Sequence, residues 1–287
     1  MATNSPPVRL IVNADDFGLT AGVNRAVGEL CLAGALSSAT LMATGAAFQD
    51  GVARALTTSP LGTGCHIVLV DGVPAANPES ISSLVNQKGL LQTSLPRFIV
   101  DLQRGRISEK EIEREACAQI DRLQTAGVAV THVDTHKHTH LFPRVARPLL
   151  RAAQACGVPA IRNPFEQAWS ASLTRGAFMR KLEVTVLRNF QESFRRLLRA
   201  SGLHSTDGSI GVSATGTLDA SSLQLLLDRA EGGTWELVCH PGYNDPDLDA
   251  IKTRLRGTRD VEREALLALI PKAVRSGRVE LIGFRNL

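Results

Sequence analysis

Short apolar segments alternate with segments of helical periodicity along almost the whole chain, and this alternation restricts the fold more than any other feature. The segments that we expect to form strands cover residues 8–13, 39–43, 64–70, 128–136, 159–162, 209–212, 235–239 and 279–284. Strands that alternate with helices form βαβ units and a parallel sheet. We therefore predict the α/β class, with about seven or eight mostly parallel strands in a distorted (β/α) barrel.

The length of 287 residues, with no low-complexity linker, indicates a single domain spanning residues 1–287. Within it we expect a flexible N-terminus at residues 1–7 and a long active-site loop at residues 71–95. The loop segment is rich in glycine, proline and serine, and connections of this length in a compact domain tend to be functional.

Several helix boundaries are expected from capping residues. Thr20 is placed to cap a helix that Gly34 ends, and Ser108 with Glu111 has the spacing of a capping box. Helical spacing also predicts a long helix over residues 174–200.

The composition argues against several classes of function. The net charge is +4, and nine Phe, two Trp and one Tyr offer few rings for stacking on bases, so no nucleic-acid partner is expected. The five cysteines are scattered without a C-x-x-C pair, which argues against a disulfide framework or a thiolate zinc site. No apolar run is long enough for a transmembrane segment and no signal peptide is apparent, so we expect a cytoplasmic protein.

Residues 131–140 hold four of the seven histidines together with Asp134. His136, His138 and His140 alternate along the sequence, so a strand that continued through them would place their side chains on one face. Histidine is the side chain that most often binds metals. This segment therefore indicates a metal-assisted site, and a polar surface loop is the alternative interpretation.

Polar residues elsewhere fall at the ends of expected strands. Asp15 and Asp16 follow the first strand, His66 lies near the start of the third, Arg162 ends the fifth, and His240 precedes a Pro-Gly turn. The carboxyl ends of barrel strands face one common cavity, where such barrels place their chemistry. We expect these distant positions to meet there.

Asp16, His66 and His136 are the candidate ligands of one divalent metal ion, because an Asp/His/His set with open positions suits catalysis. Such an ion polarises a carbonyl and lowers the pKa of a bound water. Asp15 then stays free as a general base, and His240 can protonate a leaving amine.

Structural interpretations of the same residues remain open at this point. The aspartate pair could cap a helix, His66 could be a packed strand histidine, and His240 could be a loop residue. Arg162 could orient Asp15 by a bidentate contact or join a helix to the sheet.

Asp134, His138 and His140 are expected to support the metal ligands, and His132 is expected deeper in the sheet.

Four motifs together resemble the YdjC-like carbohydrate deacetylase family, whose best-known members are chitooligosaccharide deacetylases. They are N-A-D-D-F-G at 13–18, G-C-H at 64–66, T-H-V-D-T-H-K-H-T-H at 131–140 and C-H-P-G at 239–242. The resemblance runs from about residue 9 to about residue 284. It implies a distorted (β/α) barrel that removes N-acetyl groups from amino sugars by metal-assisted hydrolysis.

The resemblance also implies roles for single residues. Asp15 resembles the family's catalytic base, and Asp16, His66 and His136 resemble its metal ligands. Magnesium is the metal usually attached to the family, although two imidazoles equally suit zinc or another transition ion.

Lys137 marks a departure, because chitooligosaccharide members typically carry three consecutive histidines there. The His-Lys-His-x-His pattern and residues 69–72 resemble the hopanoid-biosynthesis branch, whose substrate is an N-acetylglucosaminyl lipid.

We therefore expect a metal-dependent hydrolase that acts on an N-acetylated sugar or glycolipid. A homodimer is a possible oligomeric state. A phosphoesterase and a non-catalytic metal-dependent sugar-binding protein are the alternatives.

Overall fold

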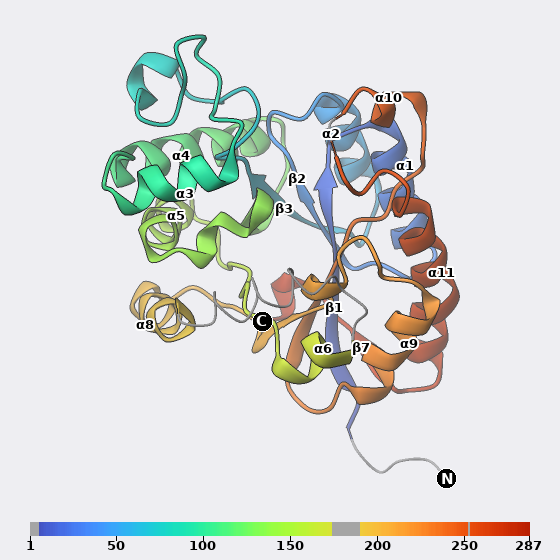
Figure 1. Cartoon of the computed structure of the whole chain (residues 1–287). Coiled ribbons are helices and arrows are strands. Elements are labelled where there is room, and N and C mark those ends of the chain that lie inside the picture. Colours follow the sequence, from blue (N-terminus) through green and yellow to red (C-terminus); the bar gives the residue numbers. More distant parts are fainter. Residues whose placement is uncertain (1–5, 174–189, 252) are drawn as a thin grey trace.

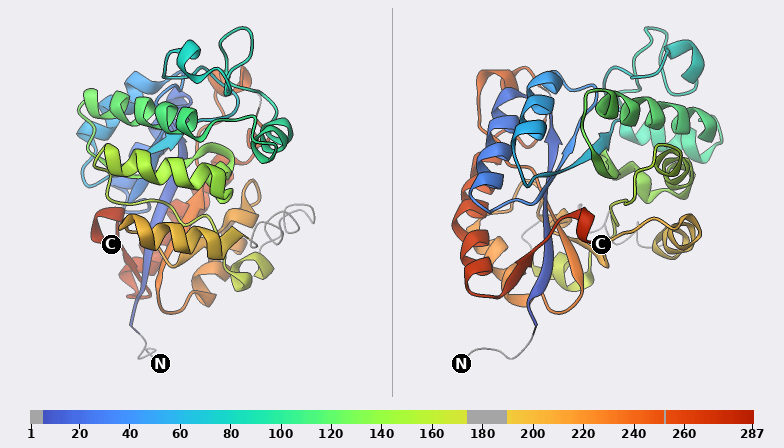
Figure 2. Two further views of the ribbon diagram at one scale, coloured as in Figure 1. Left: turned by 90° about the vertical axis from the view of Figure 1, so that its left-hand side faces the viewer. Right: turned by 180° about the vertical axis from the view of Figure 1, so that it is seen from behind.

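The computed structural model describes residues 6–173, 190–251 and 253–287. A curled sheet stands at the centre, with α3, α4, α5 and α8 on one side and α1, α2, α9 and α11 on the other (Figure 1). Figure 2 shows the same arrangement from the side and from behind. Within the described ranges, no helix is both long and apolar enough to cross a membrane.

The sheet has seven strands in the described part of the chain, and all of its strand pairs are parallel. The strands are β1 (Val8–Phe17), β2 (Ser38–Leu41), β3 (Gly62–Ile67), β4 (Val130–Thr135), β5 (Gly208–Ile210), β6 (Thr234–Cys239) and β7 (Val279–Leu281). Their order is β4-β3-β2-β1-β6-β5, and β7 also pairs with β1. β1 is central and almost completely buried, as expected of a strand covered on both faces.

Isolated bridges continue the pairing beyond the two outer strands. Val133 of β4 pairs with Ile161, Ala160 pairs with His204, and Glu166 pairs with Ser209 of β5. Backbone pairing therefore extends from β4 towards β5 across the open side of the sheet. The prediction of a distorted (β/α) barrel in one α/β domain is confirmed, although the expected strand at 159–162 forms only bridges.

Helices join and cover the strands. They are α1 (Ala21–Leu32), α2 (Phe48–Thr57), α3 (Leu95–Gln103), α4 (Glu109–Thr125), α5 (Pro143–Ala155), α6 (Ala168–Leu173), α8 (Gln191–Ser201), α9 (Ala220–Arg229), α10 (Pro246–Asp249) and α11 (Arg259–Arg275). Short 3-10 turns are η1 (Pro78–Ile81), η2 (His136–Leu141), η4 (Val212–Ala214) and η5 (Phe284–Asn286). Of the helix expected over 174–200, residues 174–189 lie outside the described residues, as do residues 1–5 of the expected flexible N-terminus.

One helix cap is confirmed and another prediction is wrong. The Thr20 side chain accepts a hydrogen bond from the Val23 N–H at 3.2 Å. Ser108 precedes α4 but makes no side-chain cap, and the Glu111 carboxylate instead accepts the N–H of Ser83 at 2.7 Å. The capping box is therefore replaced by a contact that anchors the 71–95 segment.

The same face of α4 holds this segment at further points. The Glu115 carboxylate, which is fully buried, accepts the N–H groups of Ala75 and Ala76 at 2.8 and 2.9 Å. Gln119 binds both the N–H and the carbonyl of Val68, at 2.8 and 2.7 Å. Because the backbone groups of Val68 are already paired with the Gln119 side chain, β3 ends at Ile67 rather than at residue 70.

The end of the chain packs against the inside of the barrel. The last strand ends at Leu281 rather than at 284, and Phe284 stacks on the imidazole of His132 at a centroid distance of 3.7 Å. Gly64 also lies against that ring, and a Cβ at Gly64 would stand 2.4 Å from the imidazole. His132 is completely buried, as expected of a residue deep in the sheet.

Candidate active site

Three side chains from separate strands converge at the carboxyl end of the barrel. Asp16 comes from β1, His66 from β3, and His136 from the residue that follows β4. Asp16 Oδ1 lies 3.6 Å from His66 Nε2 and 3.3 Å from His136 Nδ1, and the two ring nitrogens are 3.3 Å apart. Asp16 and His66 are buried, whereas a quarter of the His136 side chain is exposed, so the cluster reaches the surface beside His136.

The local backbone explains how adjacent aspartates point in different directions. β1 continues through Asp15 and Asp16 instead of ending at Asn13, and its register with β2 shifts between Ala14 and Phe17. Asp16 has φ of 65°, a left-handed conformation that is costly for a residue with a side chain. The two aspartates, which were expected to follow the strand, therefore lie at a bulge within it.

His66 is held by Asp134, which is completely buried. The distance from His66 Nδ1 to Asp134 Oδ1 is 2.7 Å, so Nδ1 donates its proton to the carboxylate and Nε2 faces the cluster. Burial alone would lower the pKa of His66, but the carboxylates of Asp134, Asp15 and Asp16 raise it to about 9. His66 was expected near the start of its strand, and because β3 ends at Ile67 it lies near the carboxyl end.

Arg162 forms a bidentate contact with Asp15. This was one of the two roles expected for Arg162, the other being a link between a helix and the sheet. Its Nη1 and Nη2 lie 2.8 and 2.6 Å from the two oxygens of Asp15. The same buried guanidinium contacts Asp134 at 2.5 Å and Glu236 at 2.7 Å. Burial alone would raise the pKa of Asp15, but Arg162 holds it well below its usual range.

His240 follows β6 directly and lies beside the same carboxylate. Its Nε2 is 3.8 Å from Asp15 Oδ2, and the residue is 8% exposed. Burial lowers the pKa of His240 to about 4, so the ring is neutral at neutral pH. Asp15 Oδ2 therefore has both Arg162 Nη1 and His240 Nε2 nearby.

The histidine run does not continue as a strand, which corrects the expectation for His138 and His140. β4 ends at Thr135, and Lys137 and His138 have positive φ angles of 59° and 50°. His140 folds back so that its Nδ1 lies 2.6 Å from the Thr135 hydroxyl. His138 and His140 are 6.4 Å apart between ring centroids, and burial lowers the pKa of His138 to about 3.

Four residues of the site were not singled out in the sequence. Thr40 of β2 contacts Asp134 at 3.2 Å, and Glu236 of β6 pairs with Arg162. Arg259 and Glu262 of α11 contact Asp16 and the His240 backbone.

The residues that converge fit a divalent cation. Asp16 Oδ1 is buried and has no hydrogen-bond partner among the described residues. Donors bound to one tetrahedral or octahedral ion stand about 3.0–3.5 Å from one another, close to the distances between these three atoms. One carboxylate and two imidazoles form a donor set that suits zinc or another transition ion and also admits magnesium.

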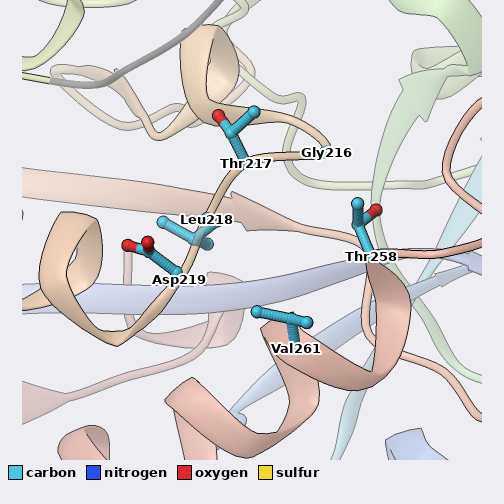
Figure 3. Close-up of a pocket in the computed structure, with 6 residues that line it drawn as sticks. All are labelled: Gly216, Thr217, Leu218, Asp219, Thr258 and Val261. Atoms are coloured by element: carbon cyan, nitrogen blue, oxygen red, sulfur yellow. The ribbon is translucent and has the colours of Figure 1, made fainter.

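A separate pocket of about 290 Å³ lies beside the first turn of α11 (Figure 3). It is lined by Gly216, Thr217, Leu218, Asp219, Thr258 and Val261. It shares no residue with the cluster of Asp16, His66 and His136.

Known proteins resemble the chain in sequence. A family model described as YdjC-like protein matches residues 9–273. A carbohydrate deacetylase of Geobacillus stearothermophilus is 38% identical over 260 residues, which cover 84% of this chain and 82% of that protein. A chitooligosaccharide deacetylase of Serratia marcescens is 33% identical over 284 residues, which cover 97% of this chain and 98% of that protein.

A solved structure shows the same fold. A protein of Enterococcus faecalis V583, named provisionally as a cellobiose-phosphate cleavage protein, has a TM-score of 0.74 and 22% sequence identity. The match covers 98% of each chain. The family model extends over all of the converging residues described above, from Asp15 to Glu262, and the chain belongs to the YdjC-like protein family.

Proposed function

We propose that this protein is a metal-dependent carbohydrate deacetylase that hydrolyses the acetamide of an N-acetylglucosamine-containing substrate. The observation that carries the proposal is the convergence of Asp16, His66 and His136 beside a carboxylate, Asp15, that Arg162 holds in place. Relatives named carbohydrate deacetylase and chitooligosaccharide deacetylase support the same reaction.

Asp16, His66 and His136 would hold the metal ion. When bound, a divalent cation supplies Lewis-acid polarisation of the acetamide carbonyl and acidifies a coordinated water. Asp15 accepts the proton of the attacking water, and the Arg162 fork keeps both of its oxygens oriented for that task.

His240 completes the transfer of the proton. Because burial lowers its pKa to about 4, His240 starts as a neutral ring and takes up the proton that Asp15 has received, over the 3.8 Å between them. It then delivers the proton to the leaving nitrogen as the C–N bond breaks. The new C–O bond leaves acetate, and the sugar retains a free amine.

The 71–95 segment is proposed as one wall of the substrate site. α4 fixes it through Glu111 and Glu115, and Lys137 Nζ reaches Asp71 Oδ2 at 3.4 Å. We propose a chitooligosaccharide-type sugar as the substrate, with an N-acetylglucosaminyl lipid as the lipid-linked form of the same chemistry.

The test is an assay of acetate release and of free amine formation from N-acetylated chitooligosaccharides, with Mg²⁺, Mn²⁺ or Zn²⁺ added to metal-free protein. Asp15→Asn should bind metal but lose activity, and His136→Ala should lose both. His204→Ala is the matched control, because this exposed imidazole lies outside the cluster.

Unchanged activity in Asp15→Asn or His136→Ala would refute these roles. The same panel includes phosphate esters and N-acetylglucosaminyl lipids. Release of phosphate would replace the proposal by a phosphoesterase, and sugar binding without turnover would replace it by a binding protein.

A further inference from the structure

The first turn of α11 touches the candidate site with a charged side chain that is completely buried. Arg259 Nη2 lies 2.6 Å from Asp16 Oδ2, and its Nη1 lies 3.4 Å from the carbonyl oxygen of His240. One guanidinium therefore spans a proposed metal ligand and the backbone of the proposed proton donor. These two residues are 224 positions apart in the chain.

The contact with Asp16 decides which of its oxygens is free. Arg259 occupies Oδ2, so the carboxylate cannot rotate without losing a charged hydrogen bond in a buried place. Oδ1 is left without a hydrogen-bond partner among the described residues, and it faces His66 and His136. Asp16 also has a left-handed backbone, and a residue held in this way needs surrounding contacts to keep it there.

The contact with His240 is matched by a second residue one turn further along α11. The Glu262 carboxylate accepts the N–H of His240 at 2.6 Å and the N–H of Gly216 at 3.2 Å. Arg259 and Glu262 thus bind the two backbone polar groups of His240 from one face of a helix.

The Pro-Gly turn after His240 is shaped around the same arginine. A Cβ on Gly242 would lie 3.0 Å from Arg259 Cδ and 3.1 Å from Val23 Cγ2. Both contacts are tighter than a side chain normally tolerates, so a glycine here leaves room for the stem of Arg259.

We propose that Arg259 is a positioning residue, which presents Asp16 Oδ1 to the metal and fixes the distance between Asp16 and His240. This inference rests on the metal site of the proposed function and not on the deacetylation itself. Groups that orient metal ligands typically contribute 10–100-fold to metal affinity.

The experiment measures Mn²⁺ binding to metal-free protein by titration calorimetry in the wild type, Arg259→Met and Arg259→Lys. Arg263→Met is the matched control, because Arg263 lies one turn further on the same helix and pairs with Asp260 and Glu29 instead of the site. Circular dichroism and thermal melting establish which variants are folded.

We expect Arg259→Met to weaken Mn²⁺ binding about tenfold or more, and Arg263→Met to leave it unchanged. Arg259→Lys should recover part of the affinity, because an ammonium can still pair with Asp16 Oδ2 but cannot span to His240. If Arg259→Met does not fold, Arg259→Lys decides, with an expected loss of several-fold.

Mn²⁺ affinity within about twofold of the wild type in a folded Arg259 variant would overturn the proposal, as would an equal loss in Arg263→Met or a wild-type protein that binds no Mn²⁺. If the affinities change as expected but the wild type releases no acetate, the proposed reaction is wrong and the role of Arg259 stands.

Discussion

Replacing Arg162 by methionine should remove the positive charge that holds the centre of the barrel together. The guanidinium is completely buried and contacts three carboxylates, those of Asp15, Asp134 and Glu236. Methionine fills a similar volume, but it leaves these carboxylates buried without their partner. Removing one partner of a buried ion pair costs about 3–5 kcal/mol, and we expect a loss of that size in the free energy of unfolding.

In a protein of this size the loss corresponds to a decrease of roughly 10 °C in Tm. Urea unfolding of the wild type and of Arg162→Met measures this loss of unfolding free energy. Arg147→Met is the control, because the ion pair of Arg147 with Glu109 is partly exposed and should contribute less than about 1 kcal/mol.

The loss should depend on pH in a defined direction. In the wild type the pKa of Asp15 lies below its usual range, so its contribution to stability is present at neutral pH and is lost as the pH falls through the folded-state pKa. Without Arg162, burial raises the pKa of Asp15, so the variant instead loses stability as the pH rises. The difference in stability between wild type and variant should therefore be smaller at about pH 4 than at pH 8. A loss below about 1 kcal/mol, or one that is equal at pH 5 and pH 8, would refute the reasoning.

Three further predictions concern the surroundings of the site. Gly64→Ala would place a Cβ 2.4 Å from the His132 ring, and should lower the free energy of unfolding by about 1–3 kcal/mol in urea titrations; an unchanged midpoint would contradict the packing. Lys137→Met removes the partly exposed ion pair with Asp71, so the free energy of unfolding should change by less than about 1 kcal/mol. KM for the oligosaccharide should rise, and an unchanged KM would show that the 71–95 segment does not line the substrate site. Chelation should abolish acetate release and lower Tm, and a metal at 100 times its Kd should restore about 2.7 kcal/mol; full activity in chelator would rule out a metal-dependent reaction.

The architecture was predictable because it depends on periodicity. Buried parallel strands are short apolar runs, the helices between them have an apolar stripe, and both patterns are visible in one sequence. Convergence at the carboxyl end of the barrel then follows from topology. For this reason Asp15, Asp16, His66, His136 and His240 could be expected to lie together before their distances were known.

Strand ends were less predictable, because side chains far away in sequence decide them. Residues 68–70 are as apolar as the strand before them, but Gln119 binds the backbone of Val68, and β3 ends at Ile67, one residue after His66. The alternating histidines are also compatible with a strand, yet His140 turns back to Thr135 through its side chain. Alternation of residue type cannot distinguish these outcomes.

The contribution of α11 was missed because its pattern of burial is opposite to the usual one. Arg259 and Glu262 are buried, while Val261 between them is 46% exposed. A rule that places apolar residues inside and charged residues outside therefore assigns both charges to solvent. Burying them is favourable only because each charge meets a partner, Arg259 with Asp16 and Glu262 with two backbone N–H groups. Those partners come from other segments of the chain, so only the folded chain can show that this helix helps to hold the site.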